Sequence, residues 1–134
     1  MEVKLSLKES WFDAVNAKGA RIKLGAGRED AVSPMEAVLM AAGGCSGIDI
    51  VSILEKMRQP LEGLEITVTG QRREEHPRFF REIAIRYVLK GNLDAEKVQR
   101  AIELSLSKYC SVTNGLEPNA KISYEYLLEN GEEA

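Results

Sequence analysis

The chain carries repeated stretches in which apolar and polar residues alternate. In residues 3–7, Val3, Leu5 and Leu7 are separated by Lys4 and Ser6, the period of two expected for a strand with one buried face. The same pattern predicts four more strands, at residues 20–24, 64–69, 82–89 and 122–128. Residues 10–15 are a candidate for a sixth strand, between the strands at 3–7 and 20–24.

A long helix is predicted between the third and fourth strands. Ser33 has the character of an N-cap, Pro34 suits the first helical position, and Glu36 completes a capping box. Pro60 ends the helix, so we expect it to run to about Arg58. Residues 37–54 are apolar nearly all round, and we expect other elements to surround this helix on most sides.

A second helix is predicted after Asp94, which can cap it. Its inner stripe would be Val98, Ile102, Leu106 and Tyr109, at helical spacing. We expect this helix to fray near Cys110, and the pair Asn114–Gly115 indicates a turn.

These elements predict an α+β fold with the order βββ-α-ββ-α-β. A chain of 134 residues favours one domain, so residues 1–134 are predicted to form a single unit. Residues 129–134 form an acidic tail that we expect to be solvated. The net charge of −3, from 18 basic and 21 acidic residues, provides no positive surface for nucleic acid or anionic membranes, and neither is expected as a partner.

Two cysteines and one histidine limit the chemistry. They exclude a four-ligand Cys/His zinc site within one chain. A Cys–His hydrolase would need His76, which lies in a polar loop and is expected at the surface. The first ten residues lack the pattern of a signal peptide, so a cytoplasmic location with reduced cysteines is expected.

Cys45 and Cys110 are the candidate reactive residues. A thiolate is the nucleophilic form of cysteine, and Asp49, one helical turn after Cys45, would disfavour it. A working Cys45 therefore needs a cationic partner from another element. The alternative is that both cysteines are inert core residues, because free cysteine is often buried.

Two motifs resemble those of the OsmC/Ohr family of osmotically inducible and organic-hydroperoxide-resistance proteins. The run SPMEAVLMAAGGC at 33–45 resembles the first cysteine motif, and KYCSV at 108–112 resembles the second. The segment RREEHPR at 72–78 resembles a poorly characterised OsmC-like branch. The likeness covers nearly the whole chain, with the same order of elements.

This resemblance implies a thiol peroxidase without metal, flavin or nucleotide. Cys45 would attack the O–O bond of an organic hydroperoxide and become a sulfenic acid, and Cys110 would resolve it as a disulfide. The implied reductant is a dithiol, such as a lipoylated protein. The resemblance further implies an intertwined homodimer with its active sites where the subunits meet.

The family's supporting residues are less clearly matched. Its active-site glutamate precedes the cysteine by ten positions, where this chain has Met35, and Glu36 follows one position later. Glu36 is about 13 Å from its own Cys45 along a straight helix, so a partner's helix would have to supply it. Its alternative role is the capping box.

The family's arginine, which pairs with that glutamate and stabilises the thiolate, is best matched by Arg21. Arg28 is a rival and Arg72 or Arg73 a more distant one. An ordinary surface role is the alternative for each of them.

Two principal functions remain open at this point. The first is an organic hydroperoxide reductase that uses Cys45 and Cys110. The second is a non-catalytic module of the same fold that binds a small hydrophobic ligand at the dimer interface, and a structural or docking role is a third reading. The position of the two sulfurs in the folded protein separates these hypotheses, because a disulfide needs Cα atoms within about 7 Å.

Overall fold

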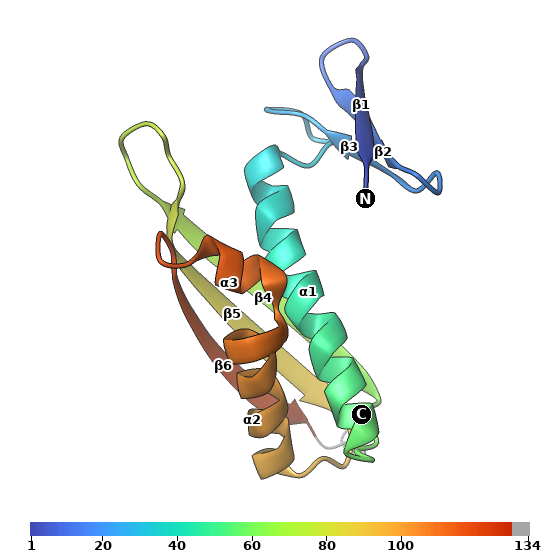
Figure 1. Cartoon of the computed structure of the whole chain (residues 1–134), viewed down its shortest axis with the longest axis vertical. Helices are drawn as coiled ribbons and strands as arrows, with labels where there is room; N and C mark the ends of the chain where they lie inside the picture. Colours follow the sequence, from blue (N-terminus) through green and yellow to red (C-terminus); the bar gives the residue numbers. More distant parts are fainter. Residues whose placement is uncertain (130–134) are drawn as a thin grey trace. The chain divides into compact units, whose positions relative to one another are not determined.

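The first three strands form a small antiparallel sheet. The computed structural model describes residues 1–129 and divides the chain into two compact units, residues 1–38 and the part from residue 39 onward. In the first unit the strand order is β1 (Val3–Leu7), β2 (Phe12–Asn16) and β3 (Arg21–Leu24) (Figure 1). The second strand begins at Phe12 instead of residue 10, because Lys8 N–H bonds to the Trp11 carbonyl and closes a turn there. Residues 130–134 of the predicted acidic tail lie outside the described part of the chain.

The long helix α1 (Pro34–Lys56) begins where the sequence predicts. Ser33 N–H donates to Glu36 Oε1 at 2.9 Å and Glu36 N–H donates to Ser33 Oγ at 3.1 Å, which is the predicted capping box. The helix ends at Lys56, earlier than the predicted Arg58. Arg58 has a φ of 60°, so the chain leaves the helix through a left-handed residue before Pro60 is reached.

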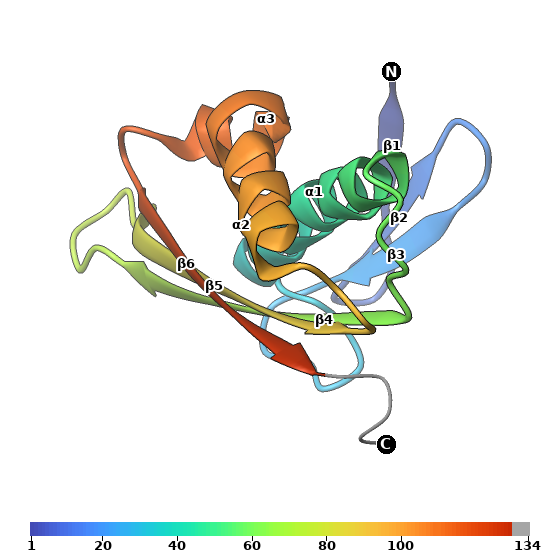
Figure 2. The ribbon, with the colours of Figure 1, turned by 90° about the horizontal axis from the view of Figure 1, so that it is seen from below.

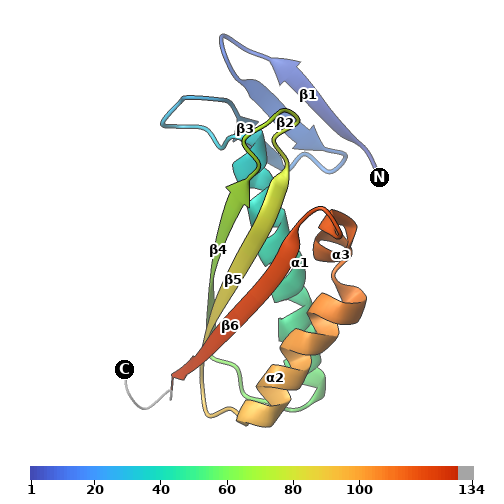
Figure 3. The ribbon, with the colours of Figure 1, turned by 90° about the vertical axis from the view of Figure 1, so that its left-hand side faces the viewer.

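The second sheet carries the core of the larger unit. It consists of β4 (Gly63–Arg72), β5 (Phe80–Lys90) and β6 (Lys121–Glu129) in the order β4-β5-β6. β4 and β5 form the predicted antiparallel hairpin, whereas β6 runs parallel to β5. The helices lie together on one face of this sheet (Figures 2 and 3). The chain therefore has a mixed α+β fold with two sheets and three α-helices in its described residues.

Alternate residues of the sheet face the helices and form the core. Ile83, Ile85, Tyr87 and Leu89 of β5 are all buried. Burying one such aliphatic side chain stabilises the fold by about 2 kcal/mol. Opposite them, α1 buries one face, which includes Ala42, Gly43, Ser46, Gly47, Ile50 and Leu54.

Two glycines bring α1 close to β4. A Cβ atom at Gly43 would lie 2.9 Å from Val68 Cγ2, and one at Gly47 would lie 2.7 Å from Ile66 Cδ1. The spacing of four residues places both glycines on the buried face of the helix. Gly43 and Gly47, on either side of Cys45 in the chain, thus allow α1 to pack close to β4.

The other face of α1 stays uncovered by the elements of its own unit. Met40 is 60% exposed, Ile48 73% and Val51 44%, so the expectation of burial on most sides does not hold within this unit. Among the described helices, α1 is the one long and apolar enough to cross a membrane, and a core helix can meet the same criteria. Its buried face against β4 and β5 supports the reading as a core helix.

The segment after α2 differs from the prediction. α2 (Ala95–Leu104) is capped by Asp94 as expected and continues as the π-helical segment η1 (Ser105–Tyr109), in which Cys110 N–H bonds to the Ser105 carbonyl five residues earlier. The wider turn shifts the helical register, so Tyr109 is 51% exposed instead of lying on the inner stripe. Residues predicted as a turn form a further helix, α3 (Ser111–Leu116), whose N-cap is Cys110.

Candidate functional site

The two cysteines lie side by side although 64 residues separate them in the chain. Cys45 Sγ, Cys110 Sγ and a carboxylate oxygen of Asp49 are all within 4.8 Å of one another, and both cysteines are free thiols. Cys45 comes from the middle of α1 and Cys110 from the junction between η1 and α3. The predicted proximity of the two sulfurs is confirmed. A disulfide between them would need the sulfurs to approach to about 2.05 Å.

Cys110 is the more enclosed thiol of the pair. It is fully buried, whereas Cys45 is half-buried. Burial raises the pKa of the Cys110 thiol, and the neighbouring Thr113 acts in the opposite direction. Thr113 N–H donates to Cys110 Sγ at 3.4 Å. The Thr113 hydroxyl is buried close to this sulfur, and among the described residues it makes no hydrogen bond of good geometry.

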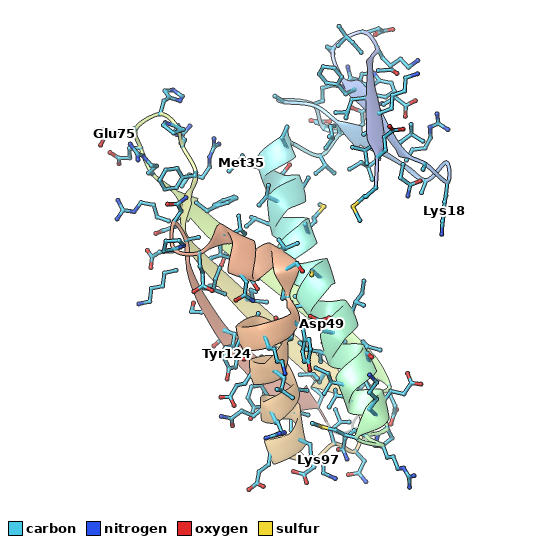
Figure 4. All side chains as sticks on the ribbon, viewed as in Figure 1. Lys18, Met35, Asp49, Glu75, Lys97 and Tyr124 are labelled. Carbon is cyan, nitrogen blue, oxygen red and sulfur yellow. The ribbon has the colours of Figure 1, made fainter. Side chains whose placement is uncertain are left out.

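Asp49 adds a carboxylate to the two thiols. It lies four residues after Cys45 in α1, on the side that faces the α2–η1 segment (Figure 4). Ser105 Oγ–H donates to Asp49 Oδ2 at 2.9 Å, and Ser105 is fully buried. The π-helical turn is what directs both Ser105 and Cys110 inward, so η1 completes the site. Such turns are common at functional sites.

A pocket of about 480 Å³ opens beside Asp49. Both α1 and the α2–η1 segment contribute to its walls, and its polar side chains include two cations. The lining residues are Asp49, Ser52, Ile53, Lys56, Met57, Arg100, Leu104 and Tyr109. We call it the Asp49 pocket. It provides a route from solvent toward the carboxylate that contacts Ser105.

Beneath Cys45, a buried hydrogen-bond chain fixes α1 to the sheet. Tyr87 O–H donates to Ser46 Oγ at 2.7 Å, and Ser46 O–H donates to the Ala42 carbonyl at 3.0 Å. Burial raises the pKa of Tyr87 to about 12, with the Ser46 hydrogen bond acting in the opposite direction. The neutral phenol is thus part of the support for the helix turn that carries Cys45.

Replacing this phenol should change stability in a pH-dependent way. Because the folded-state pKa of about 12 exceeds the unfolded value of 10.0, Tyr87 stabilises the fold below pH 10 and loses that contribution as the pH rises toward 12. We expect Tyr87→Phe to lower the free energy of unfolding by about 1 kcal/mol at pH 8. Above pH 10, the free energy of unfolding of the variant should decline less steeply with pH than that of the wild type. Urea unfolding at pH 8 and pH 11 measures both effects. Tyr109→Phe, at an exposed tyrosine, is the control and should follow the wild type at both pH values.

Glu36 and Met35 both lie in the first turn of α1 (Figure 4 labels Met35). The Glu36 carboxylate bonds to Ser33, and this contact lowers the pKa of Glu36. Glu36 therefore has the predicted capping role in the structure. Its catalytic role stays a prediction.

Arg21 is bound to another residue of its own sheet. Its guanidinium donates to both carboxylate oxygens of Asp13, at 3.1 and 3.2 Å, so it does not pair with Glu36 in the described contacts. Arg28 binds Asp30 and Ser10. Arg72 bonds to the Arg78 carbonyl, and Arg73 lies over the Phe79 ring. The arginine that would support a thiolate stays a prediction for all four.

The sequence did not predict that Asp49 and Ser105 form part of this site. Asp49 was noted only as an unfavourable neighbour of Cys45, although its spacing of four residues already placed both side chains on one helix face. No pattern in the sequence indicated that Ser105 faces inward, because the π-helical turn departs from the regular spacing from which inward positions of a helix are predicted. His76 is exposed, which confirms the prediction of a surface residue.

This chain combines an α+β fold with two neighbouring thiols, one on the long helix α1 and one at the junction between η1 and α3. The family model described as OsmC-like protein matches residues 27–125, and this chain belongs to that family.

Relatives and solved structures agree with this assignment. Protein YhfA of Escherichia coli K12 is 47% identical over 117 residues, which cover 86% of this chain and 87% of YhfA. A structure of a hypothetical protein from Aquifex aeolicus VF5 is 39% identical with a TM-score of 0.83, covering 96% of each chain. An organic hydroperoxide resistance protein OsmC from Legionella pneumophila, 14% identical with a TM-score of 0.71 over 93% of this chain and 94% of its own, shares the fold.

Proposed function

We propose that this protein is a cysteine-based peroxidase that reduces organic hydroperoxides in the cytoplasm. The observation that carries the proposal is the position of the Cys45 and Cys110 sulfurs, which lie within 4.8 Å of each other. Structural neighbours named as organic hydroperoxide resistance proteins support the same chemistry. No resident cofactor is required, because thiols supply the electrons.

In the first step, the Cys45 thiolate attacks one oxygen of the hydroperoxide. An S–O bond forms, the O–O bond breaks, and the alkoxide takes up a proton and leaves as the alcohol. Cys45 is then a sulfenic acid. Cys45 takes this role because it is half-buried, while Cys110 is fully buried.

In the second step, Cys110 attacks the Cys45 sulfur. An S–S bond forms, the S–O bond breaks, and the hydroxyl leaves as water. The thiol proton of Cys110 must move during this step because burial raises the pKa of that thiol. Asp49, within 4.8 Å of both sulfurs, accepts this proton and returns it to the departing hydroxyl. The buried Thr113 hydroxyl, which acts to lower the pKa of Cys110, donates to the Cys110 sulfur as its negative charge develops.

A dithiol then reduces the disulfide by thiol–disulfide exchange and closes the cycle. A lipoylated protein is the kind of reductant we expect. The Asp49 pocket, with Ile53, Met57 and Leu104 among its walls, offers an apolar surface for an organic group. This favours organic hydroperoxides over hydrogen peroxide.

Stoichiometric oxidation tests the proposal. Reduced protein treated with one equivalent of cumene hydroperoxide should lose both free thiols within minutes. The product should be an intramolecular Cys45–Cys110 disulfide, identified by peptide mapping under non-reducing conditions. Thiol titration that still counts two free cysteines would show that the protein is not a peroxidase of this kind.

One observation favours a second function, a non-catalytic module that binds a small hydrophobic ligand. The Glu36 carboxylate is occupied by Ser33, and Met35 stands where the resemblance places a glutamate, so the thiolate lacks that part of the family's support. Unreacted thiols in the titration above, together with binding of an apolar fluorescent probe, would select this function.

We further propose that the protein is a homodimer. Met40, Ile48 and Val51 expose an apolar stripe of α1, and a sheet of the first unit exposes Val3 and Leu5. A second copy that covers these surfaces would remove them from water. It would also allow Glu36 and Arg21 of the partner to approach Cys45. Light scattering should give twice the chain mass of 14.9 kDa, and Ile48→Glu should give a single chain mass.

A further inference from the structure

We propose that the reduced protein binds one Zn²⁺ ion through Cys45, Asp49 and Cys110. This assignment goes beyond the proposed peroxidase, since it concerns the resting dithiol and does not depend on any reaction with peroxide. It departs from the expectation of no metal, which the family resemblance implied, and it uses a carboxylate that the count of cysteine and histidine ligands did not include.

The spacing of the three donors suits a small tetrahedral cation. Zinc binds thiolate sulfur at about 2.3 Å and carboxylate oxygen at about 2.0–2.2 Å, which puts neighbouring ligand atoms about 3.5–3.8 Å apart. The two Sγ atoms and the Asp49 oxygen are within 4.8 Å of one another. Side-chain rotations that move these atoms by about 1 Å would therefore give them the spacing that a zinc ion requires. Two sulfurs and one oxygen favour zinc over magnesium or calcium, which prefer oxygen alone.

The surroundings hold the donors in position. Ser105 donates to Asp49 Oδ2, which leaves Oδ1 free to bind the ion. Thr113 N–H donates to Cys110 Sγ and orients that sulfur. Such contacts behind the ligands fix their orientation and typically change metal affinity 10- to 100-fold. The donors also come from two elements, α1 and the η1–α3 junction, so the ion would connect them.

Charge and access are compatible with a cation. None of the ion pairs in the described residues involves Asp49, so its carboxylate is not already neutralised by a lysine or arginine at contact distance. The Asp49 pocket gives a path from solvent. Lys56 and Arg100 also line this pocket; their positive charges oppose the approach of a bare cation but favour an anion as the fourth ligand of zinc in place of water.

Zinc binding and thiol oxidation would exclude each other. When the ion binds, both thiols lose their protons to solvent and their sulfurs bond to the metal. A sulfur that is bound to the metal is not available for oxidation, and a sulfur that is part of a disulfide cannot bind the metal. The metal would therefore protect the cysteines until it is removed.

Cobalt titration of the full-length reduced protein tests the site. We expect one Co²⁺ per chain, with a sulfur-to-cobalt charge-transfer band in the near ultraviolet that Zn²⁺ abolishes by displacement. Protein oxidised with diamide to the Cys45–Cys110 disulfide should give no band, a comparison that needs no substitution of buried Cys110. Absence of the band from the reduced protein would overturn the proposal.

Matched variants identify the remaining donors. Asp49→Asn should weaken Zn²⁺ binding at least 10-fold in calorimetry, and Ser105→Ala about 10-fold. Ser107→Ala is the control, because Ser107 lies on the same π-helical segment but bonds to the Glu103 carbonyl. Unchanged affinity in Asp49→Asn would overturn the three-donor site. These measurements use no peroxide, so they can succeed or fail independently of the proposed peroxidase.

Discussion

Cys45→Ser is expected to abolish peroxide consumption, with a loss of more than about 10³-fold. The serine hydroxyl is not ionised near neutral pH, so it cannot replace the thiolate that attacks the O–O bond. Residual cumene hydroperoxide measured with dithiothreitol as reductant gives the rate. Urea unfolding must show that the variant is folded. A folded Cys45→Ser protein that still consumes peroxide would reassign the nucleophile to Cys110.

Cys110→Ser is the matched control because it removes the other sulfur of the same pair. We expect this variant to react with one equivalent of peroxide and to stop at the Cys45 sulfenic acid, which dimedone traps as an adduct. The wild type should give little adduct, because Cys110 consumes the sulfenic acid first. Equal adduct in both proteins would show that Cys110 does not resolve Cys45.

Asp49→Asn separates the two chemical steps. The first step should be retained, because removal of a negative charge close to Cys45 does not disfavour its thiolate. The second step should slow about 10- to 100-fold, since no base remains to take the Cys110 proton. Stopped-flow thiol loss together with dimedone trapping distinguishes the steps. Disulfide formation at the wild-type rate would remove Asp49 from the mechanism.

The elements with strong local signals could be predicted from the sequence. The alternation in residues 64–69 and 82–89 predicted the hairpin of β4 and β5, because one face of each strand packs against helices and the other faces water. Ser33 and Glu36 fixed the start of α1, since the capping box is a contact between residues three apart. Both signals depend only on near neighbours in the chain.

The parts that depend on distant neighbours could not be predicted. The parallel pairing of β6 with β5 leaves no mark in β6 itself, which alternates in the same way as an antiparallel strand would. The π-helical turn at Ser105–Tyr109 adds a residue to one turn without a change of composition. A regular helix therefore placed Tyr109 inside, whereas the structure exposes Tyr109 and buries Ser105 and Cys110.

The two cysteines of the candidate site could be predicted from the sequence, whereas the polar residues that contact them could not. Two cysteine motifs with the expected order of elements led to a prediction that Cys45 and Cys110 meet, and they do. Asp49 looked unfavourable because a carboxylate beside a thiolate raises the thiol pKa. Its contact with Ser105 and its distance of at most 4.8 Å from both sulfurs suit it to other uses that we propose, as a proton acceptor or a metal ligand, and only the folded chain reveals them.

Gly91→Ala is expected to destabilise the fold by about 3 kcal/mol. Gly91 directly follows β5 and has a φ of 135°, a conformation that residues with a Cβ rarely adopt. An added Cβ would lie 2.5 Å from the Pro60 carbonyl oxygen, which belongs to the backbone and cannot rotate away. The Gly91 N–H also bonds to the Glu129 carbonyl, so a shift at Gly91 would disturb the end of β6.

Gly115→Ala is the matched control for this substitution. Gly115 lies in α3, and a Cβ there would meet nothing within 4 Å. Because alanine is a better helix former than glycine, this variant should be unchanged or up to about 1 kcal/mol more stable. Urea unfolding midpoints of the two variants, compared with the wild type, measure the difference. If Gly91→Ala unfolds at the wild-type midpoint, the segment that contains Pro60 moves aside, and the close approach between Gly91 and this segment does not constrain the fold. A low midpoint for Gly91→Ala alone would show that the close approach of Gly91 to the Pro60 carbonyl, together with the positive φ of Gly91, contributes to the stability of the fold.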